Sequence, residues 1–443
     1  MPRKKTLFRL ITVLLVVSAF LVAPITARGV DKERVLYSFC PVNGCVDGLV
    51  PSGYLIFDSS GSLYGVTGAG GVNGWGAVFR LTPGADGKWK EKVLHSFNEE
   101  DGSIPGGGLI FDAAGNLYGT TGEGGAFYNC GYDPVYGCGT VFELTPGSDG
   151  RWKEKVIHNF NGQSNDGFYA GASLVSDAAG NLYSTTSSGG ANNSCSQVNS
   201  SGCGTVFRLT RDAKGQWKES VIYSFKGNHG WEPLGNLIFD KKGNLYGTTS
   251  QGGRYRGGTV FQLSPSGHGV WSERVLHHFN GKDGAQPYGG LIFDAAGNLY
   301  GTTTSGGAYS GCGGTGCGVA FQLTPGTSGE WREKILHSFG AVKDGTSPTA
   351  GMIFDAAGNL YGTTFGGGAH GQGLHCGNEP CGTVFQLTPG THGQWKETVL
   401  HSFSGPPDGD TPLGTLILDC EGNLYGTAYG GAYDAGAIFE ITP

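Results

Sequence analysis

Short apolar runs alternate with glycine-rich turns along almost the whole chain, and the pattern recurs. In one copy, residues 109–111 and residues 117–121 flank the turn sequence Asp-Ala-Ala-Gly-Asn. Glycine can adopt a positive φ and Asp can bond its own turn backbone, so this arrangement predicts a β-hairpin. Near-copies make seven structural units, which begin at Leu55, Leu109, Leu174, Leu237, Leu291, Met352 and Leu416.

Each unit contains two further strand-like runs, for example residues 139–144 and 152–160, joined by the turn Thr-Pro-Gly-Ser-Asp-Gly. Four strands per unit, repeated seven times, are typical of a β-propeller. We therefore predict an all-β, seven-bladed β-propeller with four-stranded blades. The seven turn aspartates set the repeat, at Asp58, Asp112, Asp177, Asp240, Asp294, Asp355 and Asp419.

The two ends of the chain carry incomplete units that complement each other. Residues 33–39 match the fourth strand of a unit, but no first, second or third strand precedes them. The last unit has only its first three strands. An open solenoid would need capping repeats, so a closed ring explains these ends better. We predict that the N-terminal strand pairs with the C-terminal repeat and covers an otherwise open edge.

Aromatic residues recur at fixed places in the second and third strands of every unit. An aromatic ladder could serve as a platform for sugars, but sevenfold repetition favours a core packed between neighbouring blades. The positions are Tyr64, Tyr118, Tyr183, Tyr246, Tyr300, Tyr361 and Tyr425, with Phe79, Phe142, Phe207, Phe261, Phe321, Phe385 and Phe439.

The loops divide into two classes. We call the turns between strands one and two the 1–2 turns, and those between strands three and four the 3–4 turns. If the first strand is innermost, these short turns lie on one face of the ring. The other face then carries the long, variable 2–3 loops and the connecting loops, which run from each fourth strand to the next first strand. Variable loops on a rigid scaffold usually carry binding, so a ligand is expected on this second face.

The first 28 residues differ from the rest. Four basic residues precede an apolar run over residues 10–22, and small residues follow at 23–27. This pattern is typical of a secretory signal peptide, with an uncleaved anchor as the alternative. We expect a secreted or periplasmic protein with one propeller domain over residues 33–443 and no membrane span after the leader. The net charge of −7 is mild, so nucleic acid is not an expected partner.

The chain contains eleven cysteines, and ten of them form close pairs in the sequence. Disulfides form in the oxidising environment that an exported protein meets. Disulfides are the favoured interpretation; a zinc site lacks the further ligands it would need in each repeat. Each disulfide would close only a short loop, so these bonds are expected to stiffen loops rather than to hold the fold together. Cys420 is left unpaired. The predicted pairs are Cys40/Cys45, Cys130/Cys138, Cys195/Cys203, Cys312/Cys317 and Cys376/Cys381.

The core Leu-Ile-Phe-Asp-x-x-Gly-Asn-Leu-Tyr-Gly-Thr-Thr, continued by Gly-Thr-Val-Phe-x-Leu-Thr-Pro, resembles the GloVer tandem repeat of exported bacterial proteins. The resemblance covers essentially the whole chain after the leader. It implies export and brings no established activity. The repeat is also similar to NHL-type propellers, some of whose relatives are enzymes with a metal on the axis. This chain shows no matching ligand set, so the resemblance implies no catalytic residue, no metal and no cofactor.

Six connecting loops carry an Asp-Gly pair, and these carboxylates could ring one mouth of the channel and hold a cation. The alternative is a local turn. These residues are Asp47, Asp101, Asp166, Asp283, Asp344 and Asp408. The turn aspartates before Gly-Asn are expected to be structural, because the spacing lacks the alternating carboxylates of a calcium loop. The fourth-strand histidines are expected to form a partly exposed ladder, at His95, His158, His277, His337 and His401.

One connecting loop departs from the repeat. The loop that enters blade four has His229, Trp231 and Glu232, and blade one carries Trp75 in its 2–3 loop. A tryptophan beside His and Glu suits a carbohydrate or a peptide, whereas loop packing is the alternative. We predict any ligand site near blade four, where Asp166 and Asp283 would disfavour strongly anionic ligands.

These observations favour a secreted, monomeric binding or scaffold module for an extracellular glycan or protein. One alternative is a secreted enzyme, such as a polysaccharide lyase or hydrolase, acting at the propeller axis. Another is a structural protein of the cell envelope.

Overall fold

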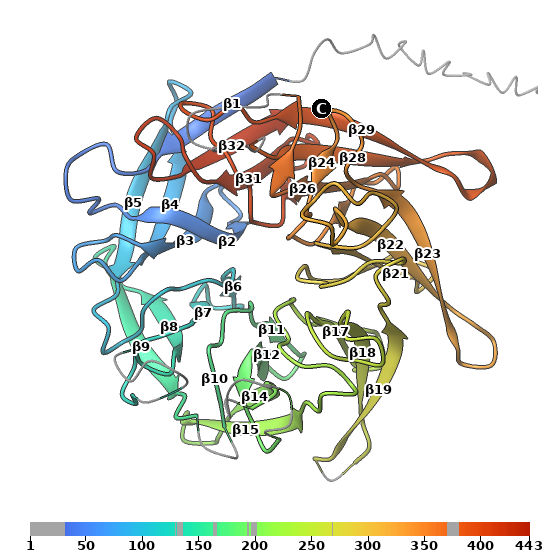
Figure 1. The fold of residues 1–443 in the computed structure, drawn as a ribbon. Helices are drawn as coiled ribbons and strands as arrows, with labels where there is room; N and C mark the ends of the chain where they lie inside the picture. Colours follow the sequence, from blue (N-terminus) through green and yellow to red (C-terminus); the bar gives the residue numbers. More distant parts are fainter. Residues whose placement is uncertain are drawn as a thin grey trace, which may run out of the picture.

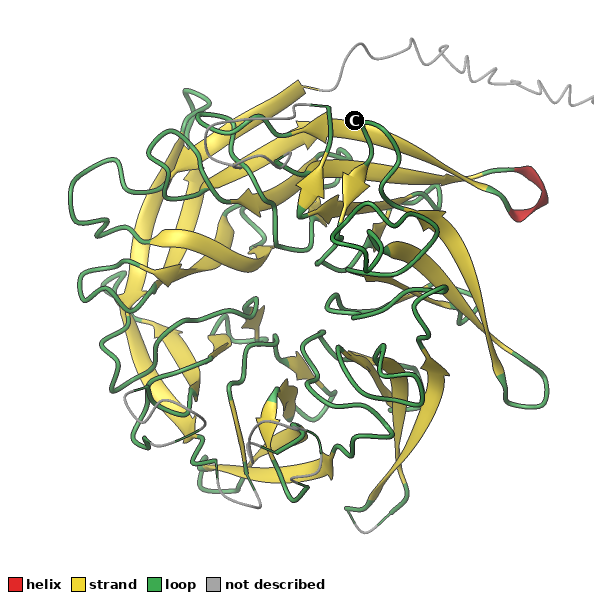
Figure 2. Ribbon diagram, viewed as in Figure 1, coloured by secondary structure: helices red, strands yellow, loops and turns green. Residues whose placement is uncertain are grey.

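Seven four-stranded antiparallel sheets form a closed ring around a central axis (Figure 1). The structure, a computed structural model, describes residues 32–443 except 129, 131–135, 163–165, 193–194, 196–201, 268 and 370–380. The predicted seven-bladed propeller is confirmed. Figure 2 shows that strands and loops make up the described residues, with one short 3-10 turn at Thr391–Gly393. The predicted leader, residues 1–28, lies outside the described residues.

The blades follow one another along the chain. Blade one contains β2 (Leu49–Phe57), β3 (Leu63–Ala69), β4 (Ala77–Pro83) and β5 (Trp89–Ser96), and blade two contains β6 (Ile110–Phe111), β7 (Leu117–Thr121), β8 (Thr140–Pro146) and β9 (Trp152–Asn159). Blade three contains β11 (Val175–Ser176), β12 (Leu182–Thr186), β14 (Thr205–Arg211) and β15 (Trp217–Ser224), and blade four contains β16 (Ile238–Phe239), β17 (Leu245–Thr249), β18 (Thr259–Pro265) and β19 (Trp271–His278).

The remaining blades repeat this order. Blade five contains β20 (Ile292–Phe293), β21 (Leu299–Thr303), β22 (Val319–Pro325) and β23 (Trp331–Ser338), and blade six contains β25 (Ile353–Phe354), β26 (Leu360–Thr364), β28 (Thr383–Pro389) and β29 (Trp395–Ser402). Blade seven contains β30 (Ile417–Leu418), β31 (Leu424–Ala428) and β32 (Ala437–Thr442), completed by β1 (Lys32–Ser38). Two small ribbons pair β10 (Gly167–Phe168) with β13 (Ser188–Gly189), and β24 (Gly345–Thr346) with β27 (Gly366–Gly367).

The ring closes as the sequence predicts. Strand β1 pairs antiparallel with β32, from Lys32 opposite Thr442 to Ser38 opposite Ala437. Figure 1 shows the N-terminal strand lying beside the C-terminal ones at the outside of blade seven. The two ends of the described chain therefore share one sheet.

The first five residues of the second strand are buried in every blade, because a neighbouring blade covers each face. In β17 all five residues are buried, and Gly247 lies opposite Phe261 of β18. A Cβ on Gly247 would lie 2.7 Å from the Phe261 ring, so glycine makes room for the phenylalanine. The repeated tyrosines and phenylalanines are buried, as expected for core residues.

Phenylalanine pairs join adjacent blades. The Phe97 ring follows β5 of blade one and packs edge-on against Phe142 of blade two, with ring centroids 5.1 Å apart. Equivalent pairs join all seven neighbours, including Phe39 with Phe79 across the closing blade. The core is thus a ring of seven interfaces, and each blade depends on both of its neighbours.

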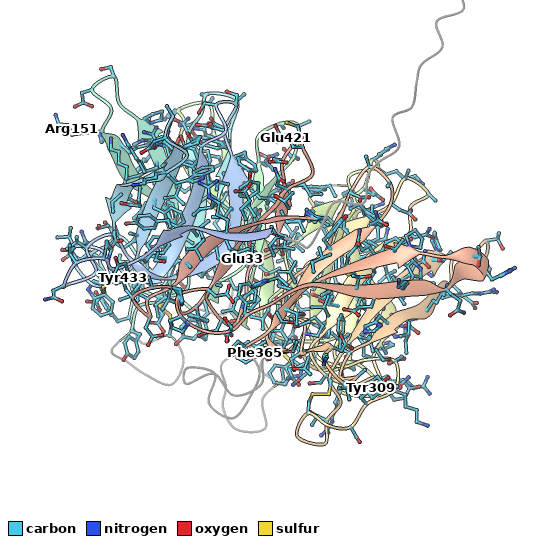
Figure 3. All side chains as sticks on the ribbon, turned by 90° about the horizontal axis from the view of Figure 1, so that it is seen from above. Glu33, Arg151, Tyr309, Phe365, Glu421 and Tyr433 are labelled. Atoms are coloured by element: carbon cyan, nitrogen blue, oxygen red, sulfur yellow. A yellow bond between two sulfur atoms is a disulfide. The ribbon has the colours of Figure 1, made fainter. Side chains whose placement is uncertain are left out.

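The two faces of the ring carry different loops. Figure 3 shows the molecule from its edge, with Arg151 of a 3–4 turn and Glu421 of a 1–2 turn on one side. Tyr309, Phe365 and Tyr433, from 2–3 loops, lie on the other side. The loop division predicted from the repeat is therefore the one that the structure has.

Four of the five predicted disulfides are formed, and they join Cys40–Cys45, Cys130–Cys138, Cys195–Cys203 and Cys312–Cys317. Cys381 is disulfide-bonded, whereas Cys376 lies outside the described residues. Cys420 is free, as predicted, and its side chain is exposed. Within the described part of the chain, none of the helical structure is long and apolar enough to span a bilayer.

Candidate functional site

The turn aspartates hold the hairpins together. Asp112 Oδ1 accepts the backbone N–H groups of Ala114 and Asn116, at 2.8 and 2.9 Å. Its Oδ2 accepts the Asn116 side-chain amide and the Tyr118 hydroxyl, at 2.8 and 3.2 Å. Burial opposes ionisation, yet these hydrogen bonds hold the pKa of Asp112 below its usual range. All four interactions are internal to the hairpin, in keeping with the structural role expected for these residues.

The connecting-loop aspartates bind the outermost strands instead of lining the channel. His95 on β5 lies 3.1 Å from Asp101 through Nε2 and Oδ2, and His337 lies 3.0 Å from Asp344 in the same way. His401 and Asp408 repeat the contact at 3.0 Å, and His277 and Asp283 at 3.3 Å. The expectation of a carboxylate ring at the axis is thus not met, because each carboxylate turns back to the strand that precedes it. His158 and Asp166 complete the set at 3.6 Å.

A glutamate from the next blade joins each of these pairs. The ligand atoms of His95, Asp101 and Glu154 all lie within 4.8 Å of one another, and Glu154 comes from β9 of blade two. We call each such group, on the outer side between two blades, a seam cluster. The same arrangement joins His158, Asp166 and Glu219, then His337, Asp344 and Glu397, then His401, Asp408 and Glu33.

A β-bulge in each outermost strand creates this arrangement. In blade one, Phe79 pairs with Val93 and Val78 with His95, so Leu94 is the extra residue. The bulge turns His95 to the opposite face of the blade from Glu91. Each outermost strand therefore gives its glutamate to one seam and its histidine, or the tyrosine that stands there in two blades, to the next. The bulge recurs in all seven blades.

The seam glutamates are held in an unfavourable environment for a charge. Burial raises the pKa of Glu154 to about 7, the neighbouring His95 lowers it, and Asp101 raises it. Burial likewise raises the pKa of Glu219 to about 8. In each cluster one buried carboxylate oxygen, Oε1, has no hydrogen-bond partner among the described residues. The recurring Trp-x-Glu motif in the sequence marks the position of these glutamates. The sequence does not reveal the bulge that brings each glutamate beside a histidine.

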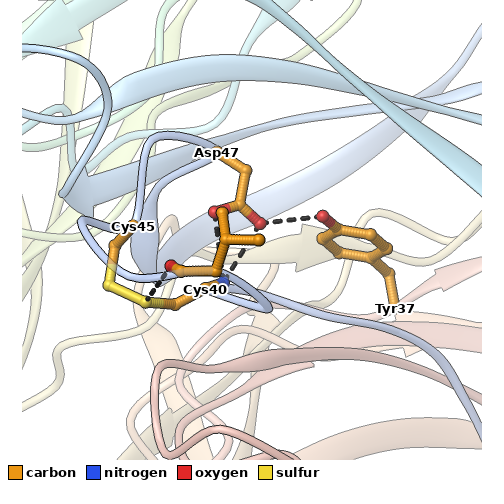
Figure 4. The surroundings of a disulfide bond; sticks show 5 residues. Tyr37, Cys40, Cys45 and Asp47 are labelled. Carbon is orange, nitrogen blue, oxygen red and sulfur yellow. Dashed lines mark hydrogen bonds between the residues drawn. A yellow bond between two sulfur atoms is a disulfide. The ribbon is translucent and has the colours of Figure 1, made fainter.

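Two seams differ from the other five. Between blades seven and one, Tyr37 replaces histidine and donates to Asp47 Oδ2 at 2.7 Å, beside the Cys40–Cys45 disulfide (Figure 4). Between blades three and four, Tyr223 replaces histidine and His229 replaces aspartate. His229 Nδ1 there lies 2.8 Å from Glu273 Oε2. The exception noted in the sequence is therefore a changed seam.

A pocket of about 400 Å³ opens beside this changed seam, on the outer side of blade four. The lining contains few carboxylates and several nitrogen groups, and Arg254 extends over the Tyr255 ring, 5.6 Å from its centroid. Burial and the nearby His277, His229 and Arg254 lower the pKa of His278. The lining residues are Asn228, His229, Arg254, Glu273, Arg274, Val275 and His278.

This pocket changes the expectation about ligand charge. Asp166 and Asp283 do not line it, since each is paired with a histidine of another seam. Arg254 and Arg274 line it instead, with Glu273 bound to His229. The local charge therefore favours an anionic group.

The other residues predicted at blade four lie apart from His229. Trp231 is half-buried and packs against the core between blades three and four. Glu232 accepts a hydrogen bond from the Ser250 hydroxyl at 3.1 Å. Burial raises the pKa of Tyr288, and the nearby Glu232 charge raises it further. Tyr288 lines the central channel, so Glu232 lies toward the axis. The three side chains do not converge on one pocket.

Trp75 occupies a position that a cysteine takes in other blades. Its carbonyl accepts the N–H of Ile104 in the next connecting loop, as the Cys138 carbonyl accepts that of Tyr169. The Trp75 side chain is half-buried against the core between blades one and two. This placement agrees with the packing alternative.

The central channel has a neutral lining. It encloses about 220 Å³ and is bordered by glycines together with hydroxyl, amide and small apolar side chains, including Tyr54, Ser173 and Asn236. Among the described residues that line it, none carries a carboxylate, imidazole, thiol or amino group. The axis thus offers few groups for acid–base catalysis.

Exposed apolar side chains concentrate on the face of the 2–3 and connecting loops. Of thirteen large hydrophobic side chains exposed in the described residues, twelve lie in these loops, and Val270 in a 3–4 turn is the exception. Seven of the twelve are aromatic, namely Phe127, Tyr128, Tyr136, Tyr255, Tyr309, Phe365 and Tyr433.

Similarity to solved structures is confined to the fold. A protein of unknown function from Dyadobacter fermentans DSM 18053 is 12% identical, with a TM-score of 0.45 over 94% of this chain and 99% of that one. A fungal alcohol oxidase of the AA5 family in complex with copper is 14% identical, with a TM-score of 0.49 over 93% and 75%. A luciferin-regenerating enzyme is 13% identical, with a TM-score of 0.42 over 93% and 95%. No curated protein matches the sequence.

The repeat itself has a family model. The model of the Gloeobacter/Verrucomicrobia repeat matches residues 25–197, 132–315, 194–374 and 311–443, which together span the whole propeller. These matches agree with the resemblance seen in the sequence motif. The chain therefore belongs to the Gloeobacter/Verrucomicrobia repeat family.

Proposed function

We propose that this protein is an extracellular binding module for an acidic polysaccharide. The observation that carries the proposal is the concentration of exposed aromatic side chains on the face of the 2–3 and connecting loops. Aromatic rings stack on the apolar faces of sugar rings, and tyrosine adds a hydroxyl for hydrogen bonding. A ring of repeated loops presents such contacts at intervals, which suits a polymer with repeating units.

The pocket at blade four supplies the charge preference. Arg254 and Arg274 offer guanidinium groups, which bind carboxylate or sulfate with charge-assisted hydrogen bonds. Arg274 also donates to the Gly329 carbonyl, at 2.5 Å, so Arg254 is the freer of the two. The neutral axis makes the lyase or hydrolase alternative less favoured, because the described residues of that lining include no ionisable side chain other than tyrosine.

The test compares binding of polygalacturonate, an acidic polysaccharide, with binding of neutral dextran by isothermal titration calorimetry. We expect binding to polygalacturonate that weakens with added salt, since exposed charge pairs are screened. Arg254→Ser is expected to weaken it about tenfold, the loss of one charge-assisted contact. Arg151→Ser, on the opposite face, is the matched control and should bind as the wild type does. Equal binding of dextran, or an unchanged Arg254→Ser, contradicts the proposal.

A further inference from the structure

We propose that four of the seam clusters are binding sites for a first-row transition-metal dication such as Zn²⁺ or Mn²⁺, one ion per seam. The sites are His95–Asp101–Glu154, His158–Asp166–Glu219, His337–Asp344–Glu397 and His401–Asp408–Glu33. This departs from the expectation of no metal drawn from the sequence. It does not depend on polysaccharide binding.

The geometry places three ligand atoms around one point. In each cluster one imidazole nitrogen and two carboxylate oxygens lie within 4.8 Å of one another. His95 Nε2 and Asp101 Oδ2 are 3.1 Å apart, close to the separation of two ligands that are each about 2.0–2.2 Å from a tetrahedral zinc ion. Three protein ligands leave room for a water molecule as the fourth.

A second observation concerns the glutamates. The buried Oε1 atoms of Glu33, Glu154, Glu219 and Glu397 accept no hydrogen bond from any described residue. A buried carboxylate without a partner is costly unless it is neutralised by a proton or a cation. The unpartnered Nε2 of His158, 3.6 Å from Asp166 Oδ1, fits the same conclusion, because a ligating imidazole nitrogen needs no hydrogen-bond partner.

The donor set selects the class of metal. Imidazole nitrogen suits zinc and its first-row neighbours, whereas Ca²⁺ and Mg²⁺ prefer oxygen ligands alone. The imidazole nitrogen therefore favours Zn²⁺ over Ca²⁺, and the two carboxylate oxygens also suit Mn²⁺. Two negative charges against a divalent ion also leave the site electrically balanced.

The fifth cluster that contains His, Asp and Glu is a weaker candidate. Its carboxylate, Asp283 Oδ2, also accepts the Asn280 side-chain amide at 2.6 Å, and it lies 3.3 Å from His277 Nε2. The two seams with tyrosine in place of histidine lack the nitrogen ligand in that position. Four ions per chain is thus the expected number.

Each ion would join two blades. His95 and Asp101 belong to β5 and the loop that follows it, whereas Glu154 belongs to β9 of the next blade. A metal bound there cross-links the outermost strands, which share no backbone hydrogen bonds across the seam. The ions would therefore raise the stability of the whole ring.

The first experiment measures the stoichiometry of metal binding by the purified protein after dialysis against EDTA. Titration with ZnCl₂ and MnCl₂ should show about four equivalents per chain, and CaCl₂ should show none at the same concentrations. The melting temperature should rise with Zn²⁺ and return to its starting value with EDTA. Absence of stoichiometric Zn²⁺ and Mn²⁺ binding would mean that the glutamates keep protons instead, and would overturn the proposal.

The second experiment uses the natural variation among the seams. His95→Tyr copies the residue found at Tyr37 and Tyr223, so the fold should be retained while one equivalent of Zn²⁺ is lost. Tyr37→His, beside Asp47 and Glu91, completes a fifth cluster and should add one equivalent. Near-UV circular dichroism checks the fold of both variants. An unchanged stoichiometry in both would show that any bound zinc lies elsewhere, which also overturns the proposal.

Discussion

At the scale of single residues, one carboxylate per blade decides the shape of the innermost hairpin. Asp112 accepts four hydrogen bonds from residues two to six positions further along the chain. The carboxylate is needed in its charged form, since both of its oxygens act only as acceptors.

Asp112→Asn tests this role. The amide nitrogen of asparagine would face the Asn116 amide and the Tyr118 hydroxyl, both of which are donors toward Oδ2. We expect a loss of about 0.5–1.5 kcal/mol in the free energy of unfolding at pH 7, the usual net value of a hydrogen bond, because Asp112 is only partly buried. Denaturant unfolding measures it. Asp86→Asn, which affects one exposed backbone contact, is the control and should cost less.

The pH dependence of that difference has a defined sign. The pKa of Asp112 is lower in the folded protein than its ordinary value, so the folded state favours the ionised form. Its contribution is fully present above the unfolded pKa and is lost as the pH falls through the folded pKa. The stability gap between wild type and Asp112→Asn should therefore shrink below about pH 4. A gap that is constant down to pH 2 would contradict the assigned hydrogen bonds.

At the scale of strands, the buried second strand depends on a missing side chain. Gly247 lies opposite Phe261, and a Cβ there would also lie 2.9 Å from Leu237. Blade three has Ser184 at the equivalent position, and its hydroxyl donates to the Ala172 and Ser173 carbonyls, at 3.1 and 3.0 Å. Those hydrogen bonds offset the crowding that the Cβ brings.

Gly247→Ala should consequently be more harmful than Gly247→Ser. Alanine adds the Cβ without a hydroxyl, and overpacking of this kind costs about 1–3 kcal/mol. Serine can donate to the backbone as Ser184 does and should recover part of the loss. Thermal unfolding of the two variants measures the difference. Equal stability of wild type and Gly247→Ala would show that the strand relaxes freely around the added group.

The strand scale also separates what the sequence predicts from what it does not. The hairpin around Asp112 follows from contiguous residues, so its turn and its flanking strands are readable. The seam of His95, Asp101 and Glu154 is not readable, because simple alternation places His95 on the same face as Glu91. The extra residue Leu94 reverses that face, and only pairing with β4 reveals the bulge.

The site predicted at blade four could not be located from the sequence for a similar reason. His229, Trp231 and Glu232 are close in sequence, but they belong to a loop that runs inward from the outermost strand toward the axis. His229 therefore stays at the outer seam, and Glu232 lies near the channel. Arg254 and Arg274, which define the charge of the pocket, come from other segments of blade four.

At the scale of the whole molecule, one strand makes the ring continuous. Strand β1 pairs with β32 and brings Phe39, which is fully buried, against Phe79 of blade one. It also contributes Glu33 to the seam with blade six and Tyr37 to the seam with blade one. Closure thus joins three blades, although only seven residues form the strand.

Deleting residues 32–39 should therefore destabilise every blade. The deletion exposes the edge of β32 and removes a phenylalanine from the interface between blades seven and one. An open, unpaired edge also favours association with other chains. We expect a large fall in melting temperature and aggregation seen by light scattering. A synthetic peptide of residues 32–39, added in trans, should restore part of the stability, because binding to the folded state shifts its equilibrium. A peptide with Phe39→Ala should restore less, since it lacks the ring that packs on Phe79. If the deletion variant had the same melting temperature as the wild type, the pairing of β1 with β32 would not be needed to close the ring.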